Sequence, residues 1–135
     1  MNPAVTLAFL RLGLVRPIDG LFYMLAQTIG GTFGVLAGFL LTAGVLAAPE
    51  TRWVVTVPGS CGPFVAFGVE FLMAMLLMLV VLRFSSTPTL RGFTGCAAAL
   101  MVALFITIAA PCSGMSINPA RTLASAIPSQ VWTAV

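Results

Sequence analysis

The chain has little charge and no histidine. Only 7% of its 135 residues are charged, whereas a soluble domain carries roughly 25%. This small number of polar side chains cannot cover the outside of a soluble domain. The composition therefore argues against a soluble protein. Without His as a base, no nucleophile–base arrangement can be drawn from its Ser, Thr and Cys residues, and we expect no enzyme.

Cysteine is also scarce. Cys61, Cys96 and Cys112 are odd in number and lack metal-ligand spacing. We interpret them as small apolar packing residues, and the sequence predicts no metal and no cofactor. The net charge of +3 does not indicate a nucleic-acid partner, because the few Arg stand at the edges of apolar runs.

Long apolar runs dominate the chain instead. Residues 20–49 and 92–120 carry no charge, and residues 66–82 hold only Glu70. Each run approaches or exceeds the roughly 20 residues that a helix needs to cross a bilayer. The sequence therefore predicts an all-α integral membrane protein that crosses the membrane several times. The predicted spans are residues 19–46, 65–83 and 92–111.

Four Arg define the predicted topology. Arg11 and Arg16 precede the first span, and Arg83 and Arg91 bracket the loop between the second and third spans. With three spans these two regions fall on the same side, which the positive-inside rule assigns to the cytoplasm. The loop 47–64 is then predicted to face outward.

A repeat links the two ends of the sequence. Residues 2–8 read N-P-A-V-T-L-A and residues 118–124 read N-P-A-R-T-L-A, so six of seven positions agree. Two copies of one unit are typical of transport proteins built from duplicated halves.

Each copy of the repeat predicts a short helix. An Asn stands at the N-cap position and a Pro at the first helical position, which both residues favour. We expect one half-helix over residues 1–13 and the other over 118–127, where Pro128 would stop it. Such helices are about 15 Å long, half of a roughly 30 Å hydrocarbon core.

The topology directs both half-helices at the membrane centre from opposite sides. Irregular backbone at that depth is tolerated only where it is buried or lines a watery cavity. Two helix N-termini bring partial positive charge to that cavity, and the amides of Asn2 and Asn118 add donors. Such a site suits water or an alcohol, repels cations, and offers no oxygen ring for a metal ion.

Two ionisable side chains are predicted at membrane depth. An Arg there is usually functional, so we interpret Arg121 as a filter that orders solute oxygens and bars cations. Anchoring a lipid headgroup is the alternative. Glu70 is the only acid within a span, and we expect it to accept hydrogen bonds from backbone N–H groups of the loop 112–118. Proton transfer is its alternative role.

Several motifs together resemble one family. They are the paired N-P-A, A-Q-T-I-G-G at 26–31, T-V-P-G at 56–59, V-E-F around Glu70, and S-G-M-S-I-N-P-A-R at 113–121. Over essentially its whole length the chain is similar to the major intrinsic proteins, the aquaporins and glycerol facilitators, in their bacterial type.

The resemblance implies a fold and a set of site residues. It implies an aquaporin-like right-handed bundle of spanning helices with two re-entrant half-helices meeting at the membrane midplane. Subunits would form homotetramers, with one pore each, in a bacterial inner membrane. The implied pore motifs are Asn2, Pro3, Ala4 and Asn118, Pro119, Ala120. The implied filter is Arg121 with Ile106 and Met115, and an apolar Ile106 would make it less polar than a water-only filter.

Members of this family carry two spans before the first motif and another after the second half-helix. We therefore expect residues 1–135 to be a single partial channel domain, truncated at both ends. The expected function is passive conduction of water or small neutral solutes such as glycerol, with ions and protons excluded. A non-conducting fragment or assembly partner of intact subunits is an alternative. A secondary transporter is another, but the sequence lacks an intramembrane acid pair for coupling.

Overall fold

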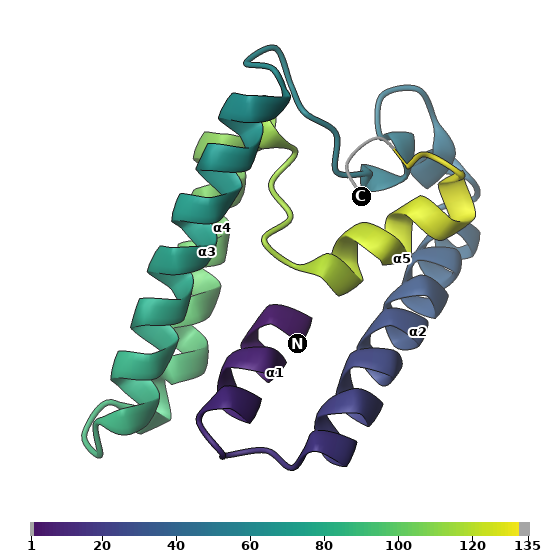
Figure 1. The fold of residues 1–135 in the computed structure, drawn as a ribbon. Helices are drawn as coiled ribbons and strands as arrows, with labels where there is room; N and C mark the ends of the chain where they lie inside the picture. Colours follow the sequence, from purple (N-terminus) through teal and green to yellow (C-terminus); the bar gives the residue numbers. More distant parts are fainter. Residues whose placement is uncertain (1, 133–135) are drawn as a thin grey trace. The chain divides into compact units, whose positions relative to one another are not determined.

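A computed structural model describes residues 2–132 and is helical, with no strand in that range. Residue 1 and residues 133–135, the ends of the predicted domain, lie outside the described residues. The helices are α1 (Pro3–Arg11), α2 (Pro17–Leu41), α3 (Pro63–Ser86), α4 (Thr94–Ser113) and α5 (Pro119–Ser129), with 3-10 turns η1 (Val45–Ala47), η2 (Arg52–Val54) and η3 (Arg91–Phe93) (Figure 1). The chain forms two compact units, Met1–Val57 with Asn118–Val135, and Pro58–Ile117.

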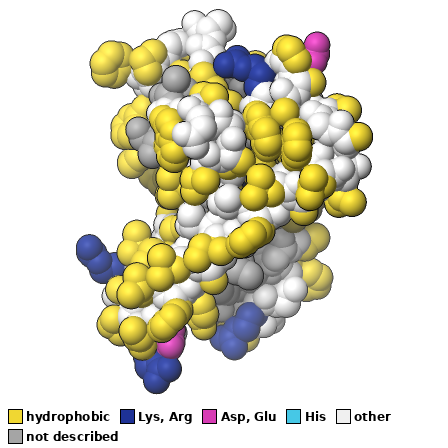
Figure 2. All heavy atoms as spheres, turned by 90° about the vertical axis from the view of Figure 1, so that its right-hand side faces the viewer, with side chains coloured by type: hydrophobic (Ala, Val, Ile, Leu, Met, Phe, Trp, Pro, Cys, Tyr) yellow, Lys and Arg dark blue, Asp and Glu magenta, His cyan; other side chains and the backbone are white. Residues whose placement is uncertain are grey.

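Three segments are long and apolar enough to cross a membrane. They are Pro17–Leu41, Pro63–Ser86 and Arg91–Ser113, with mean hydropathies of 1.6, 2.6 and 2.2. This confirms the predicted all-α membrane fold with three spans. Few residues of these segments are buried, and Figure 2 shows hydrophobic side chains over most of the face on which α2 lies. So much exposed apolar surface suits contact with lipid or with further protein.

In the first unit α2 packs against both short helices. The buried face of α5 consists of small residues, which let the two backbones come close. At the crossing, a Cβ added to Gly31 would lie 3.0 Å from the Cβ of Ala124. Helix α1 also contacts α5, and their N-terminal ends are the ends that lie nearest each other (Figure 1).

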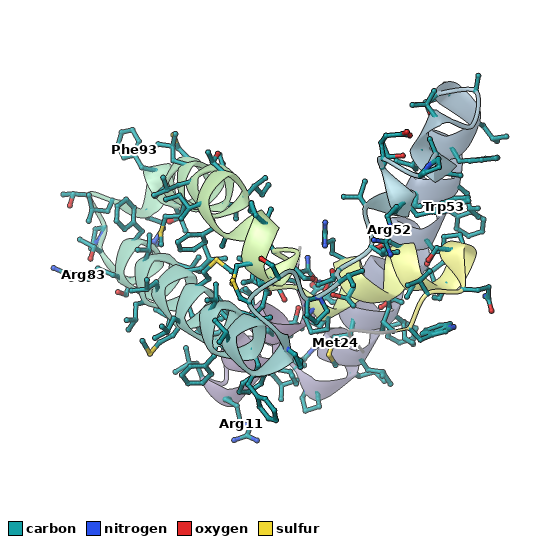
Figure 3. All side chains as sticks on the ribbon, turned by 90° about the horizontal axis from the view of Figure 1, so that it is seen from above. Arg11, Met24, Arg52, Trp53, Arg83 and Phe93 are labelled. Atoms are coloured by element: carbon teal, nitrogen blue, oxygen red, sulfur yellow. The ribbon has the colours of Figure 1, made fainter. Side chains whose placement is uncertain are left out.

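In the second unit α3 and α4 run side by side (Figure 1). Their core is formed by Met73, Leu77, Ala109, Met115 and Ile117. Arg83 and Phe93 lie at the end of the pair where α3 connects to α4 (Figure 3). Arg91 Nε donates to the Ser85 carbonyl at 3.2 Å, so Arg83 and Arg91 of the predicted cytoplasmic loop lie at the same end of this unit.

Helix α2 is shorter than predicted. It ends at Leu41, five residues before the expected end at residue 46. The Gly44 N–H donates to the Phe39 carbonyl (2.9 Å) and the Ala43 N–H to the Leu40 carbonyl (3.2 Å), the bonding pattern of a Schellman motif. Ala43 has a φ of +48° and Gly44 a φ of +86°. The chain therefore leaves the helix there, although the apolar run continues.

The expectation that Pro128 ends the second half-helix was wrong. Helix α5 continues to Ser129 and ends at Gln130, which adopts a left-handed φ of +57°. A proline in the last turn removes only one backbone hydrogen bond, and the Ser129 hydroxyl donates to the Ser125 carbonyl at 2.6 Å. Helix α4 likewise continues two residues past Pro111.

Candidate functional site

The two copies of the repeat form the same helix cap. Asn2 Oδ1 accepts a hydrogen bond from the Ala4 N–H at 2.9 Å. Asn118 Oδ1 accepts from the N–H groups of Ala120 at 3.1 Å and Arg121 at 3.4 Å. Both Asn have extended backbones, with φ of −154° and −149°, and a proline follows each. The repeat therefore specifies one local structure twice, at the start of α1 and of α5.

This cap fixes the direction of each amide. Because Oδ1 faces its own helix, the Nδ2 group with its two donors is the other end of each side chain. The two N-terminal ends also bring the partial positive charges of both helices into one region. Partial positive charge of this kind attracts electronegative atoms and repels cations.

Helix α2 fixes the start of α1. Gln27 Nε2 donates to Thr6 Oγ1 at 3.2 Å, and the buried Thr6 hydroxyl donates to the Asn2 carbonyl at 3.3 Å. Gln27 Oε1 is buried and has no partner among the described residues. The sequence reasoning missed this contact, although Gln27 lies in the A-Q-T-I-G-G motif and Thr6 in the repeat.

The side chain of Arg121 is held by the loop after α2. Its Nη1 donates to Thr56 Oγ1 at 2.6 Å, and Thr56 Oγ1 lies 3.3 Å from Thr122 Oγ1. The same loop is fastened to α2 by the stacked rings of Phe39 and Trp53, whose centroids are 4.9 Å apart. Thr56 is a site residue that the sequence reasoning missed, although it begins the T-V-P-G motif.

A cavity of about 430 Å³ lies in the first unit, between α2, the loop and α5. Small and apolar residues form most of its wall, and its polar groups come from Gln27, Asn118, Arg121 and Ser125. A mainly apolar wall with a few polar groups is typical of sites for small molecules. Among residues 2–132 there is no group of three or more His, Cys, Asp or Glu side chains that could hold a metal.

Glu70 organises the segment before the second motif. Its Oε1 accepts from the Ser113 hydroxyl at 2.6 Å and the Ser116 N–H at 3.0 Å. Its Oε2 accepts from the Ile117 N–H at 2.6 Å. One carboxylate thus binds three donors across the segment that connects α4 to α5.

That segment has an unusual backbone. Gly114, Met115 and Ile117 have φ of +76°, +39° and +45°, and a β-branched residue rarely adopts such a value. The bonds to Glu70 hold this conformation in place. The peptide bonds of residues 2–132 are all trans, so each carbonyl there points opposite to the N–H of its peptide unit. The carbonyl groups of Met115 and Ser116 therefore point away from Glu70.

The two other predicted filter residues belong to the second unit. Ile106 lies on α4 with 52% of its surface exposed, whereas Met115 is 4% exposed and packs in the core with Met73 and Leu77. Arg121 belongs to the first unit. A filter made of Arg121, Ile106 and Met115 together stays a prediction.

The fold and this site define a helical membrane protein with a duplicated, Asn-capped short helix. A sequence model of the family described as "Major intrinsic protein" matches residues 1–135. Aquaporin NIP6-1 of Arabidopsis thaliana is 35% identical and the match covers 100% of this chain and 43% of that protein. A probable aquaporin NIP-type of Nicotiana alata is 31% identical, over 98% of this chain and 47% of that protein. Aquaporin Z of Photorhabdus laumondii is 25% identical, over 97% of this chain and 60% of that protein.

The chain belongs to the major intrinsic protein family, as the sequence motifs predicted. It spans about half the length of the curated relatives that it matches, between 43% and 60% for these three. Family membership also agrees with the prediction that the chain is no enzyme.

Proposed function

We propose that this chain is part of a passive channel that conducts water and small neutral solutes such as glycerol and excludes ions and protons. The observation that carries the proposal is the pair of Asn-capped helices, whose N-terminal ends lie nearest each other in the first unit. The relatives are named aquaporins, which supports water as one permeant.

Selectivity in this proposal depends on charge. A passing oxygen would accept hydrogen bonds from the amides of Asn2 and Asn118, while two helix N-termini and the Arg121 guanidinium repel cations. The hydrogen bond from Arg121 to Thr56 fixes where that charge lies. We include Ile106 and Met115 in the filter, where their apolar side chains would admit solutes with carbon chains.

Glu70 has a positioning role in the proposal. By binding the N–H groups of Ser116 and Ile117 it directs two carbonyl groups to the other side of the segment. These two acceptors would replace hydrogen bonds that a solute gives up when it leaves water. We further propose a homotetramer in a bacterial inner membrane; the bacterial relative Aquaporin Z supports the location.

Stopped-flow light scattering on proteoliposomes tests the proposal. Under a sucrose gradient, vesicles with the protein should shrink faster than empty ones, and under a glycerol gradient they should also re-swell. Potassium and proton leak should equal that of empty vesicles. Saturable, ion-coupled uptake would show a secondary transporter instead. Shrinkage no faster than in empty vesicles would contradict conduction by this chain and favour an assembly partner of intact subunits.

A further inference from the structure

A closed turn rests on the C-terminal end of α4 in the second unit. The Gly62 N–H donates to the Gly59 carbonyl at 3.2 Å, which closes the turn Gly59–Gly62. The Gly59 N–H donates to the Cys112 carbonyl at 2.9 Å, which ties the turn to α4. The backbones touch here, since a Cβ added to Gly59 would collide with the Pro111 carbonyl.

This turn brings two thiols together. Cys61 is the third residue of the turn, and the first residue, Gly59, bonds to the Cys112 carbonyl, so the two cysteines lie on backbone segments in direct contact. Cys61 is exposed and Cys112 is partly exposed, and neither forms a disulfide in the structure. A role in apolar packing, which we expected from the sequence, does not account for an exposed thiol that lies beside another.

The third cysteine stands apart from this pair. Cys96 lies near the start of α4, sixteen positions before Cys112 in the same helix. At 1.5 Å per residue the two are separated by roughly 24 Å. Cys96 is exposed as well, so it provides an internal control for reactivity.

We propose that Cys61 and Cys112 are a redox modification site, at which a peroxide converts the thiol pair into a reversible disulfide. The bond would fasten the turn Gly59–Gly62 to the end of α4, next to Ser113, which hydrogen bonds to Glu70. The predicted topology places this turn on the non-cytoplasmic side, where disulfides persist. The proposal does not depend on conduction by the chain.

The chemistry requires one peroxide molecule per disulfide. The exposed Cys61 thiolate attacks a peroxide oxygen, the O–O bond breaks, and Cys61 becomes a sulfenic acid as the first water leaves. The Cys112 sulfur then attacks the Cys61 sulfur, the S–S bond forms, and the S–O bond breaks to release a second water. Two thiols lose two electrons and two protons in total, and the peroxide takes up both.

Thiol counting on the intact membrane protein tests the proposal. The protein is treated with a limiting amount of hydrogen peroxide, unfolded in detergent, and labelled with maleimide–polyethylene glycol. The wild type should fall from three labelled thiols to one, with a mass loss of about 2 Da, and a reductant should restore all three. Cys96→Ser should fall from two thiols to none, whereas Cys61→Ser and Cys112→Ser should each keep two. Loss of two labelled thiols in Cys61→Ser or Cys112→Ser as well, or a disulfide between chains, would overturn the proposal.

A glycine variant separates proximity from general reactivity. Gly59→Ala displaces the turn from the Pro111 carbonyl but keeps all three thiols, so disulfide formation should slow at least about tenfold because the two sulfurs are no longer held together. Gly68→Ala in α3 is the matched control, since its added Cβ meets nothing within 4 Å. An unchanged rate in Gly59→Ala would contradict the assignment of the pair to this turn.

Discussion

The two copies of the N-P-A motif share a cap and differ in what surrounds it. In both copies Oδ1 of the Asn binds N–H groups of its own helix. Four residues after the Asn each copy has a Thr, and Thr6 bonds to Gln27 on a helix, whereas Thr122 lies beside Thr56 on a loop. A duplicated sequence thus sets the local structure twice, while contacts distant in sequence make the two sites different.

The fourth position of the motif separates the copies further. The first copy has Val5 there and the second has Arg121. The second motif follows a segment that contains left-handed residues and is bound to the carboxylate of Glu70. The fixed side-chain charge therefore belongs to one motif only, and Thr56 holds it through a hydrogen bond.

The largest expected effect removes the support of the second copy. Glu70→Leu leaves the Ser113 hydroxyl and the N–H groups of Ser116 and Ile117 without their acceptor, at about 1–3 kcal/mol for each donor that stays buried. The temperature of unfolding in detergent should fall clearly. Glu70→Gln keeps one acceptor oxygen and should lose less. An unchanged unfolding temperature in Glu70→Leu would show that this carboxylate does not stabilise the segment.

The next change makes the copies identical. Arg121→Val gives seven matching positions of seven and removes a charged hydrogen bond to Thr56, of the class worth about 1.5–3 kcal/mol. We expect the permeability of glycerol relative to water to rise roughly tenfold, since 1.4 kcal/mol is one decade, and potassium leak to increase. Arg11→Val, at the exposed end of α1, is the matched control. The same selectivity in Arg121→Val and wild type would remove Arg121 from the filter.

The caps give a smaller, graded effect. Loss of an Asn cap costs about 1 kcal/mol, and helix α5, which Asn118 caps, buries four of its residues where α1 buries two. Asn118→Ala should therefore lower the free energy of unfolding more than Asn2→Ala, measured by denaturant titration in detergent. Asn118→Asp, which keeps the cap, should stay close to wild type. A larger loss at Asn2 would show that the burial of the capped helix does not set the order.

The smallest effect concerns the ion pair at the start of α2. Arg16 Nε lies 2.7 Å from Asp19 Oδ2, and this hydrogen bond raises the pKa of Arg16. A raised pKa means that the stabilisation is fully present below arginine's ordinary pKa and is lost only as pH rises through the higher value. The Arg16 side chain is 79% exposed, so Asp19→Asn should change stability little, and equally from about pH 6 to 9. A large loss of stability in Asp19→Asn would contradict the exposed position of the ion pair between Arg16 and Asp19.

Charge and helix-capping rules predicted the elements well. Apolar runs located α2, α3 and α4, and Asn followed by Pro located the starts of α1 and α5. The errors came at helix ends, where Ala43 adopts a left-handed backbone inside an apolar run and Pro128 is accommodated in a last turn. Hydropathy does not report backbone conformation, so the end of α2 was predicted too late.

The site was predicted only in part, because distance along the chain hides contacts. Residue spacing indicated Asn2, Asn118 and Arg121 as a group. The hydrogen bond between Thr56 and Arg121 joins residues 65 positions apart, and it depends on how the loop folds against α2. No local pattern in the sequence carries that information.

The crossing of α2 and α5 has a consequence for the placement of Arg121. Gly31 leaves just enough room for Ala124, so the residue at this position works as a spacer between the two helices. Helix α5 is short and is capped by Asn118. An outward shift at Ala124 would therefore move the whole helix, and the guanidinium of Arg121 with it. Gly31→Ala is therefore expected to move the charge by a few tenths of an ångström without altering any polar group.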